Sequence, residues 1–318
     1  MRRAGLVAAS GSRDGDGMPA SRPLPTELAG RVFTRAEALA HGLTPRMLDG
    51  SRIVSIHPGV HRYADTEPTF ALMVEAARHV LPRDAAISHV TNLRWRGYEV
   101  GTELPLHFST NVPRHVDREG LVVHRRQGWL HPEIVRGVPV LGPDRTFVDC
   151  ATRLSVGTLV RVGDWLVATG QTDVTRLHDY VLKSHLDGVQ RARRAALLVR
   201  AGSESPRETD VRLALLDAGL PEPELNVDIH DHRGRFVARG DLVYRTFGVL
   251  VEYDGWHHER DAAQRQHDHL RRERLEAEGW RVVVVTIADM RDPYAVAGRV
   301  QQALIQRGYS TYPARSGA

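Results

Sequence analysis

Asp241, Glu252 and Asp254, followed by His257 and His258, have the types and the spacing of a metal-dependent hydrolytic site. Glu252 and Asp254 stand two residues apart in an apolar segment predicted to be a strand, so both side chains project from one face. Asp241 comes from the preceding strand of the same predicted hairpin. Three converging carboxylates repel one another unless a proton or a cation lies between them. Hard oxygen ligands with part of the shell left to water suit Mg²⁺ or Mn²⁺, so we predict these three residues as metal ligands in phosphodiester hydrolysis.

The elements that must position these residues form a unit over residues 201–310. Apolar periodicity and turn residues predict the order α-β-β-β-α-β-α, which is a mixed sheet flanked by helices. Glu208 lies in the first turn of the opening helix, and Arg271 lies on the helix that follows the third strand. The predicted helices span 205–218, 260–278 and 294–307, and the predicted strands span 226–230, 236–244, 247–253 and 282–287.

This unit resembles the PD-(D/E)xK, or restriction-endonuclease-like, superfamily, and above all its small domains related to very-short-patch-repair endonucleases. The resemblance rests on Glu208, Asp241, Glu252-x-Asp254-Gly-x-x-His258, Asp268-x-x-Arg271 and Gly279-Trp280. It implies an α/β sandwich that cleaves DNA. The roles it implies are metal ligation by Asp241, Glu252 and Asp254, help through water by Glu208, a phosphate contact by Arg271 and leaving-group protonation by His258.

The chain departs from the superfamily pattern at the lysine that commonly follows the second acid by two residues, a place taken here by Asp254. Lys183 is the only lysine, so 42 of the 43 basic residues are arginine. Charge stabilisation at the phosphate would then come from Arg271, from the metal or from a histidine, which titrates near neutral pH. Structural roles stay open for these residues: a buried salt bridge for Asp241 and Glu252, a turn at Asp254, and an intrahelical ion pair for Arg271.

Residues 25–65 have the signals of a small winged helix-turn-helix. Thr34-x-x-Glu37 is a capping box that opens a helix, and Thr44-Pro45 opens a second one that runs to about residue 49. Strands at 52–57 and 60–63 follow around a Pro-Gly turn. In such a unit the candidates for contact with DNA are Arg46, Arg52, His61 and Arg62. A structural helical hairpin with solvated arginines, or a protein-docking module, is the alternative.

Residues 66–200 are predicted to be a mixed α+β region. His124 has basic and acidic neighbours but no metal-ligand spacing, so we interpret this segment as a charged strand end with structural histidines. The predicted helices span 70–81, 85–94, 143–154 and 155–170, and the predicted strands span 105–110, 120–126 and 135–140.

The first two thirds of the chain resemble the AbiEi-type antitoxins of abortive-infection toxin–antitoxin systems. This resemblance rests on residues 24–63, Pro143-Asp144-Arg145-Thr146 and Gly163-Asp164-Trp165-Leu166. It implies that the winged unit binds its own operator DNA and that a cognate toxin is a partner. The function we predict first is a metal-dependent DNA endonuclease. The alternative is a non-catalytic transcriptional regulator that keeps a degenerate nuclease-like domain as a scaffold.

The predicted elements give an α/β class overall. A chain of 318 residues is long enough for two or three domains, and 42% hydrophobic and 26% charged residues with a net charge of +4 are ordinary for a globular protein. No apolar run approaches a membrane span, and residues 1–25 lack a signal-peptide core. A single cysteine, Cys150, excludes an intrachain disulfide and suits the reducing cytoplasm. Residues 1–24 are predicted to be a disordered tail, and residues 311–318 form a short C-terminal tail.

Overall fold

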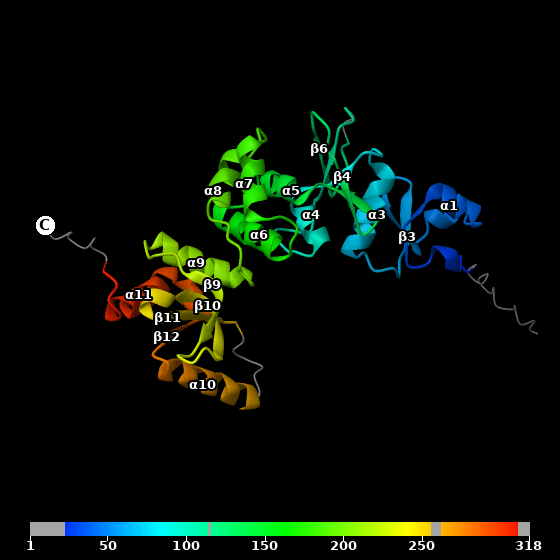
Figure 1. The fold of residues 1–318 in the computed structure, drawn as a ribbon. Helices are drawn as coiled ribbons and strands as arrows, with labels where there is room; N and C mark the ends of the chain where they lie inside the picture. Colours follow the sequence, from blue (N-terminus) through cyan, green and yellow to red (C-terminus); the bar gives the residue numbers. More distant parts are fainter. Residues whose placement is uncertain (1–22, 114–115, 256–261, 311–318) are drawn as a thin grey trace, which may run out of the picture. The chain divides into compact units, whose positions relative to one another are not determined.

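A computed structural model of the chain describes residues 23–113, 116–255 and 262–310 (Figure 1). In this part, α-helices combine with three sheets of mixed strand orientation, which confirms the predicted α/β class. The chain forms two compact units, Met1–Arg83 and Asp84–Ala318. Among the described helices, none has the length and apolar character that a membrane crossing requires.

The first unit contains the predicted pair of short helices and the hairpin. Thr34 Oγ1 accepts a hydrogen bond from Glu37 N (3.2 Å), and Glu37 Oε2 accepts one from Thr34 N (2.7 Å), so the capping box is present. Thr44 Oγ1 caps the second helix by accepting a hydrogen bond from Met47 N, without a reciprocal partner of the capping-box kind. The elements are β1 (Phe33–Thr34), α1 (Arg35–Ala40), α2 (Pro45–Leu48), β2 (Ile53–His57) and β3 (Val60–Tyr63), with sheet order β1-β3-β2.

The unit is longer than the predicted range of residues 25–65, because helix α3 (Phe70–Val80) belongs to it. Leu72 and Ala76 of α3 are buried against Val32 and Val60. The sequence shows the helix but not the surface against which its apolar side packs. The compact first unit therefore extends to Arg83.

The second unit begins with a five-stranded sheet in the order β6-β5-β4-β8-β7. Strands β5 and β6 are parallel, as are β4 and β8, whereas β4–β5 and β7–β8 are antiparallel. The strands are β4 (Ala86–Ile87), β5 (Leu106–Thr110), β6 (Leu121–Arg125), β7 (Glu133–Val135) and β8 (Val138–Val140).

Five helices pack beside this sheet around a shared apolar core that includes Leu93, Phe147 and Leu166. They are α4 (His89–Arg96), α5 (Pro143–Cys150), α6 (Val156–Ala168), α7 (Val174–Lys183) and α8 (Val189–Ala196). The predicted helix at 85–94 was wrong in its first residues: β4 pairs with β5 and β8, and the helix starts only after Ser88. Strand pairing across the fold overrides local helix preference here.

The last region has the predicted order. Its sheet is β12-β11-β10-β9, with β11 and β12 parallel and the other pairs antiparallel. The described elements are α9 (Pro206–Asp217), β9 (Glu224–His230), β10 (Phe236–Tyr244), β11 (Val249–Asp254), α10 (Ala262–Ala277), β12 (Arg281–Thr286) and α11 (Pro293–Gln306). A 3₁₀ turn at Arg245–Phe247 joins β10 to β11, where the turn was predicted.

Two layers of helices cover this sheet (Figure 1). Val251 of β11 packs in one cluster with side chains of α9 and α11, whereas Leu250 packs with Leu275 of α10 on the opposite side. Because side chains alternate along a strand, Glu252 and Asp254 share the α10 face with Leu250. Asp241 shares that face with Val243, which is in the Leu275 cluster.

Candidate functional site

The predicted acidic site lies where β10 and β11 run side by side. Leu242 pairs with Val251, so Asp241 and Glu252 are the next residues along the two antiparallel strands. Asp241 Oδ2 accepts a hydrogen bond from Tyr253 N at 2.8 Å. This bond ties the Asp241 carboxylate to β11, beside the strand that carries the other two predicted ligands.

Asp241 has an unusual electrostatic environment. Burial raises its pKa to about 6, and the nearby charges of Glu208 and Glu252 act in the same direction. The hydrogen bond from Tyr253 and the charge of Arg271 act in the opposite direction. A carboxyl whose pKa is shifted by burial and by neighbouring carboxylates is typical of a functional site.

Glu252 is held by Arg271 of α10. Arg271 Nη1 lies 2.6 Å from Glu252 Oε1, and only 13% of the Glu252 side chain is exposed. Arg271 Nη2 also donates to the carbonyl of Arg239 at 2.7 Å. The arginine therefore links α10 to both β10 and β11, and it neutralises the carboxylate predicted to bind metal.

The three predicted ligands do not form a closed set. Within the described residues, Asp241, Glu252 and Asp254 do not bring one oxygen each to within 4.8 Å of one another. Asp254 ends β11 and is half-buried. The site thus holds two neighbouring acids and an arginine, with the third acid further along the same strand face.

Glu208 is buried, and its carboxylate is hydrogen-bonded to neighbouring residues. Its Oε2 accepts hydrogen bonds from Glu204 N (2.9 Å) and Asn226 Nδ2 (2.6 Å). Ser205 caps the helix at Glu208 N. Glu208 therefore joins the start of α9 to β9, and its charge still reaches Asp241.

The predictions for Trp256, His257 and His258 lie outside the described residues. The same holds for the side chain of Asp268. The predicted role of His258 at the leaving oxygen therefore stays a prediction.

The predicted DNA contacts of the first unit separate into two groups. Arg46 and Arg52 are exposed. His61 is only 7% exposed, and its ring lies 6.1 Å from that of Phe33 in the interior. Arg62 donates to the carbonyls of Tyr63 and Thr66 (3.0 and 2.7 Å) and so supports the chain after the hairpin. Burial removes His61 from the surface, so only the two exposed arginines stay as direct candidates.

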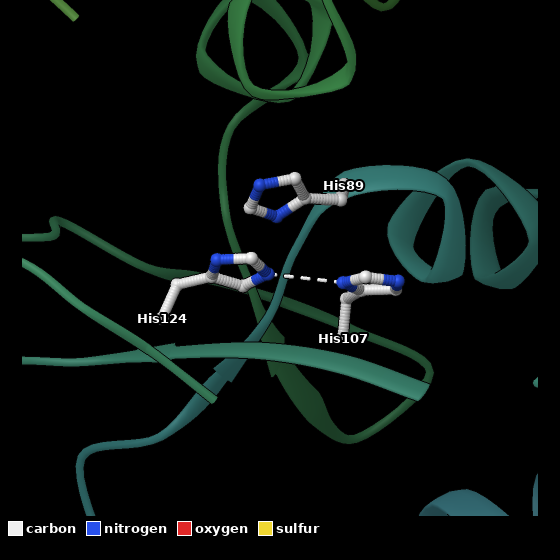
Figure 2. Close-up of side chains that lie close together, drawn as sticks. All are labelled: His89, His107 and His124. Carbon is white, nitrogen blue, oxygen red and sulfur yellow. Dashed lines mark hydrogen bonds between the residues drawn. The ribbon is translucent and has the colours of Figure 1, made fainter. Parts of the chain in front are cut away.

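A second cluster consists of His89, His107 and His124. Of these, only His124 was considered from the sequence, as part of a charged strand end with structural histidines. Each offers a ring nitrogen, and the three nitrogens lie within 4.8 Å of one another, so they could bind a metal ion. His89 opens α4, His107 lies on β5 and His124 on β6 (Figure 2). The register pairs His107 with Val122, which puts His124 on the same face two residues further on.

The rings of this histidine cluster are closely packed. Figure 2 shows His107 Nδ1 within hydrogen-bonding distance of His124 Nε2, at 2.9 Å, and His89 over the His124 ring with centroids 3.8 Å apart. His89 Nδ1 lies 2.9 Å from Ser88 Oγ, and its Nε2 lies 3.4 Å from Arg126 Nη2. The spacing of the histidines in the sequence does not predict this cluster, because strand pairing brings together residues that are far apart in the chain.

Burial and mutual repulsion hold the histidine cluster neutral. Burial lowers the pKa of His107 to about 4 and that of His124 to about 3. The pKa of His89 is lowered further still, by burial and then by the other two rings. All three are therefore unprotonated at neutral pH, which is the form that binds metal.

Comparison with known proteins gives little functional information. No family model matches the chain. Its sequence is similar to an uncharacterized protein of Mycobacterium tuberculosis, present in two strains, with 26% identity over 212 residues. The matched region covers 65% of this chain and 77% of the relative. Fold and sites therefore define an α/β protein with two acids on the inner strands β10 and β11, one of them paired with Arg271, and a separate histidine cluster.

Proposed function

We propose that this protein is a metal-dependent DNA endonuclease whose hydrolytic site is built from Asp241 and Glu252. The observation that supports the proposal most is their position on adjacent strands, with the Asp241 carboxylate bonded to Tyr253 N and with a guanidinium facing Glu252. Acids on two neighbouring strands and a cation on the covering helix match what phosphodiester hydrolysis requires. The resemblance to restriction-endonuclease-like domains points to the same reaction.

The donor set suits Mg²⁺ or Mn²⁺, because carboxylate oxygens are the ligands these ions prefer. Asp241 and Glu252 would hold the ion, Asp254 would contribute from the same strand face, and water would complete the shell. When bound, such an ion neutralises charge on a phosphoryl oxygen and lowers the pKa of bound water. Arg271 Nη1 lies 2.6 Å from Glu252 Oε1, so an ion would bind through Glu252 Oε2 or after Arg271 has left Oε1.

Arg271 then has a second role in the proposal. Among the described residues it is the cation paired with one of these acids, and once released from Glu252 its guanidinium can bind a phosphate oxygen. Glu208 keeps the start of α9 in place and adds negative charge at Asp241. The first unit would supply DNA affinity through phosphate contacts by Arg46 and Arg52.

The test is cleavage of supercoiled plasmid by the purified full chain with Mg²⁺ or Mn²⁺ and, separately, with EDTA. Asp241→Asn keeps an oxygen that accepts from Tyr253 N, and Glu252→Gln keeps the side-chain shape. Asp217→Asn, at an exposed position on α9, is the matched control. The proposal expects metal-dependent nicking in wild type and control and its loss in both site variants. Equal nicking in all four proteins would instead indicate a contaminating nuclease.

One observation favours a second candidate, a DNA-binding regulator of antitoxin type. The Arg271–Glu252 pair neutralises an acid that a metal would need, as a structural salt bridge does. In this case the chain binds operator DNA and a cognate toxin without cleaving. Sequence-specific DNA binding that weakens in Arg46→Gln and Arg52→Gln, together with no cleavage under any metal, would favour this alternative.

A further inference from the structure

We propose that His89, His107 and His124 bind a divalent transition-metal ion, with Zn²⁺ as the best-matched class. This site lies in the five-stranded sheet and does not depend on the proposed nuclease function. Its three ligands come from three separate elements, α4, β5 and β6. A site of this kind would fix the start of α4 to two strands.

The distances between ligand atoms suit a single ion. The three ring nitrogens lie within 4.8 Å of one another, and the His107 and His124 nitrogens are already 2.9 Å apart. Two imidazoles on a tetrahedral Zn²⁺ at about 2.0–2.1 Å hold their nitrogens about 3.4 Å apart. Small rotations of His107 and His124 therefore open enough room for the ion between them.

His89 must move more than the other two. Its ring now stacks on His124 with an interplanar angle of 19°, and an ion cannot lie in the planes of two stacked rings at once. A turn of His89 about its side-chain bonds brings a nitrogen toward the other two. Its backbone has φ of +53°, in the left-handed region that is uncommon for a residue with a β-carbon. Such strain is typical of positions that serve a function.

The donor atoms select the class of metal. Imidazole suits Zn²⁺, Cu²⁺, Ni²⁺ and Co²⁺, whereas Mg²⁺ and Ca²⁺ prefer oxygen. Three histidines leave a fourth position of the ion for water. The histidine cluster and the acidic site around Asp241 therefore prefer different metals.

Positive charges near the histidine cluster limit its affinity for a metal cation. Arg126 Nη2 lies 3.4 Å from His89 Nε2, and Arg153 also exerts a positive charge on all three rings. The Asp149 carboxylate neutralises part of this positive charge, because its Oδ1 accepts a hydrogen bond from Arg126 at 3.0 Å.

The experiment is a titration of the chelator-stripped full chain with Co²⁺, followed by visible absorption and calorimetry. We expect one Co²⁺ per chain, displaced by Zn²⁺, and a rise in Tm with Zn²⁺. His107→Gln and His124→Gln should each weaken Co²⁺ binding more than about 10-fold. His131→Asn, which removes an exposed histidine near the same sheet, should bind like wild type.

Two further measurements show whether the variants are folded and whether the acidic site contributes to Co²⁺ binding. Far-ultraviolet circular dichroism of the metal-free variants shows whether they are folded, and the single variant that stays folded is sufficient for the comparison. The Asp241→Asn/Glu252→Gln double variant should keep the Co²⁺ spectrum unchanged, which separates this site from the acidic one. Absence of binding in folded wild type, or binding that both histidine variants retain, would overturn the proposal.

Discussion

Arg212 and Asp164 form a fully buried ion pair that joins helix α9 to helix α6, with Arg212 Nη2 2.8 Å from Asp164 Oδ2. Arg212 is 0% exposed and Asp164 2%. Thr209 Oγ1 and Arg200 N also donate to the Asp164 carboxylate, at 2.8 Å each. Residues of the predicted ranges 66–200 and 201–310 therefore share a buried polar connection, and the Arg161–Asp210 pair at 3.0 Å adds a second link between α6 and α9. Both helices belong to the compact unit Asp84–Ala318.

Arg212→Ala should destabilise the second unit by about 3–5 kcal/mol, because it leaves Asp164 charged and buried without its partner. Lys183→Ala is the control, since the Lys183 side chain is 80% exposed and that of its partner Asp179 is 63% exposed. That change should alter stability by less than about 1 kcal/mol. Urea unfolding measures both, and an Arg212→Ala loss no larger than the control would contradict the assignment.

Two glycines of α6 should respond in opposite ways to alanine. A β-carbon at Gly163 would lie 2.4 Å from Val199 Cγ2 and 3.1 Å from Phe147 Cε2, so Gly163→Ala should cost about 1–3 kcal/mol. At Gly157 the nearest atom would be Leu213 Cδ1 at 3.8 Å, which is ordinary contact. Gly157→Ala should stabilise the protein by up to about 1 kcal/mol. Thermal unfolding of the two variants tests this, and a neutral Gly163→Ala would show that α6 can shift.

The capping box of the first unit should give a defined pH dependence. Hydrogen bonds from Thr34 lower the pKa of Glu37 from 4.5 to about 2. The ionised carboxylate is favoured in the folded state, so its contribution is complete above pH 4.5 and is lost as the pH falls toward 2. Glu37→Gln lacks this contribution. The difference in Tm between wild type and Glu37→Gln should be present at pH 7 and vanish near pH 2, and a difference that does not change with pH would refute the account.

Arg271→Gln tests the electrostatics of the acidic site without reference to cleavage. Arg271 lowers the pKa of Asp241 and neutralises Glu252, so its removal should raise the Asp241 pKa above its value of about 6. Titration of the Asp241 carboxyl by NMR measures this shift. Arg272→Gln is the neighbouring control on α10. An Asp241 pKa that stays the same in Arg271→Gln would show that the guanidinium does not face the acids in solution.

Local signals made several parts of this structure predictable. The capping box of Thr34 and Glu37 and the turn at Arg245–Phe247 are decided by residues close together in sequence, and both were predicted where they occur. The order of elements after residue 205 also followed from periodicity and turns. Such features need no knowledge of which surfaces meet.

Long-range packing explains what the sequence did not predict. His89, His107 and His124 meet only because β5 pairs with β6 beside the start of α4. The pairing of Arg271 with Glu252 depends on how α10 lies on the sheet, so the sequence could place both residues near the site but not in contact. His61 appeared to be a surface residue of a hairpin, whereas packing against Phe33 buries it.

Asp241 and Glu252 are proposed to form a metal-dependent hydrolytic site. The most direct measurement is the single-turnover rate of cleavage of a labelled DNA duplex as a function of Mn²⁺ concentration, in wild type, Glu252→Gln and Asp217→Asn. We expect the cleavage rate to saturate with Mn²⁺ in wild type and in Asp217→Asn. In Glu252→Gln we expect the rate to be at least about 100-fold lower. Folded wild-type protein that binds the duplex but cleaves nothing at any Mn²⁺ concentration would contradict the claim.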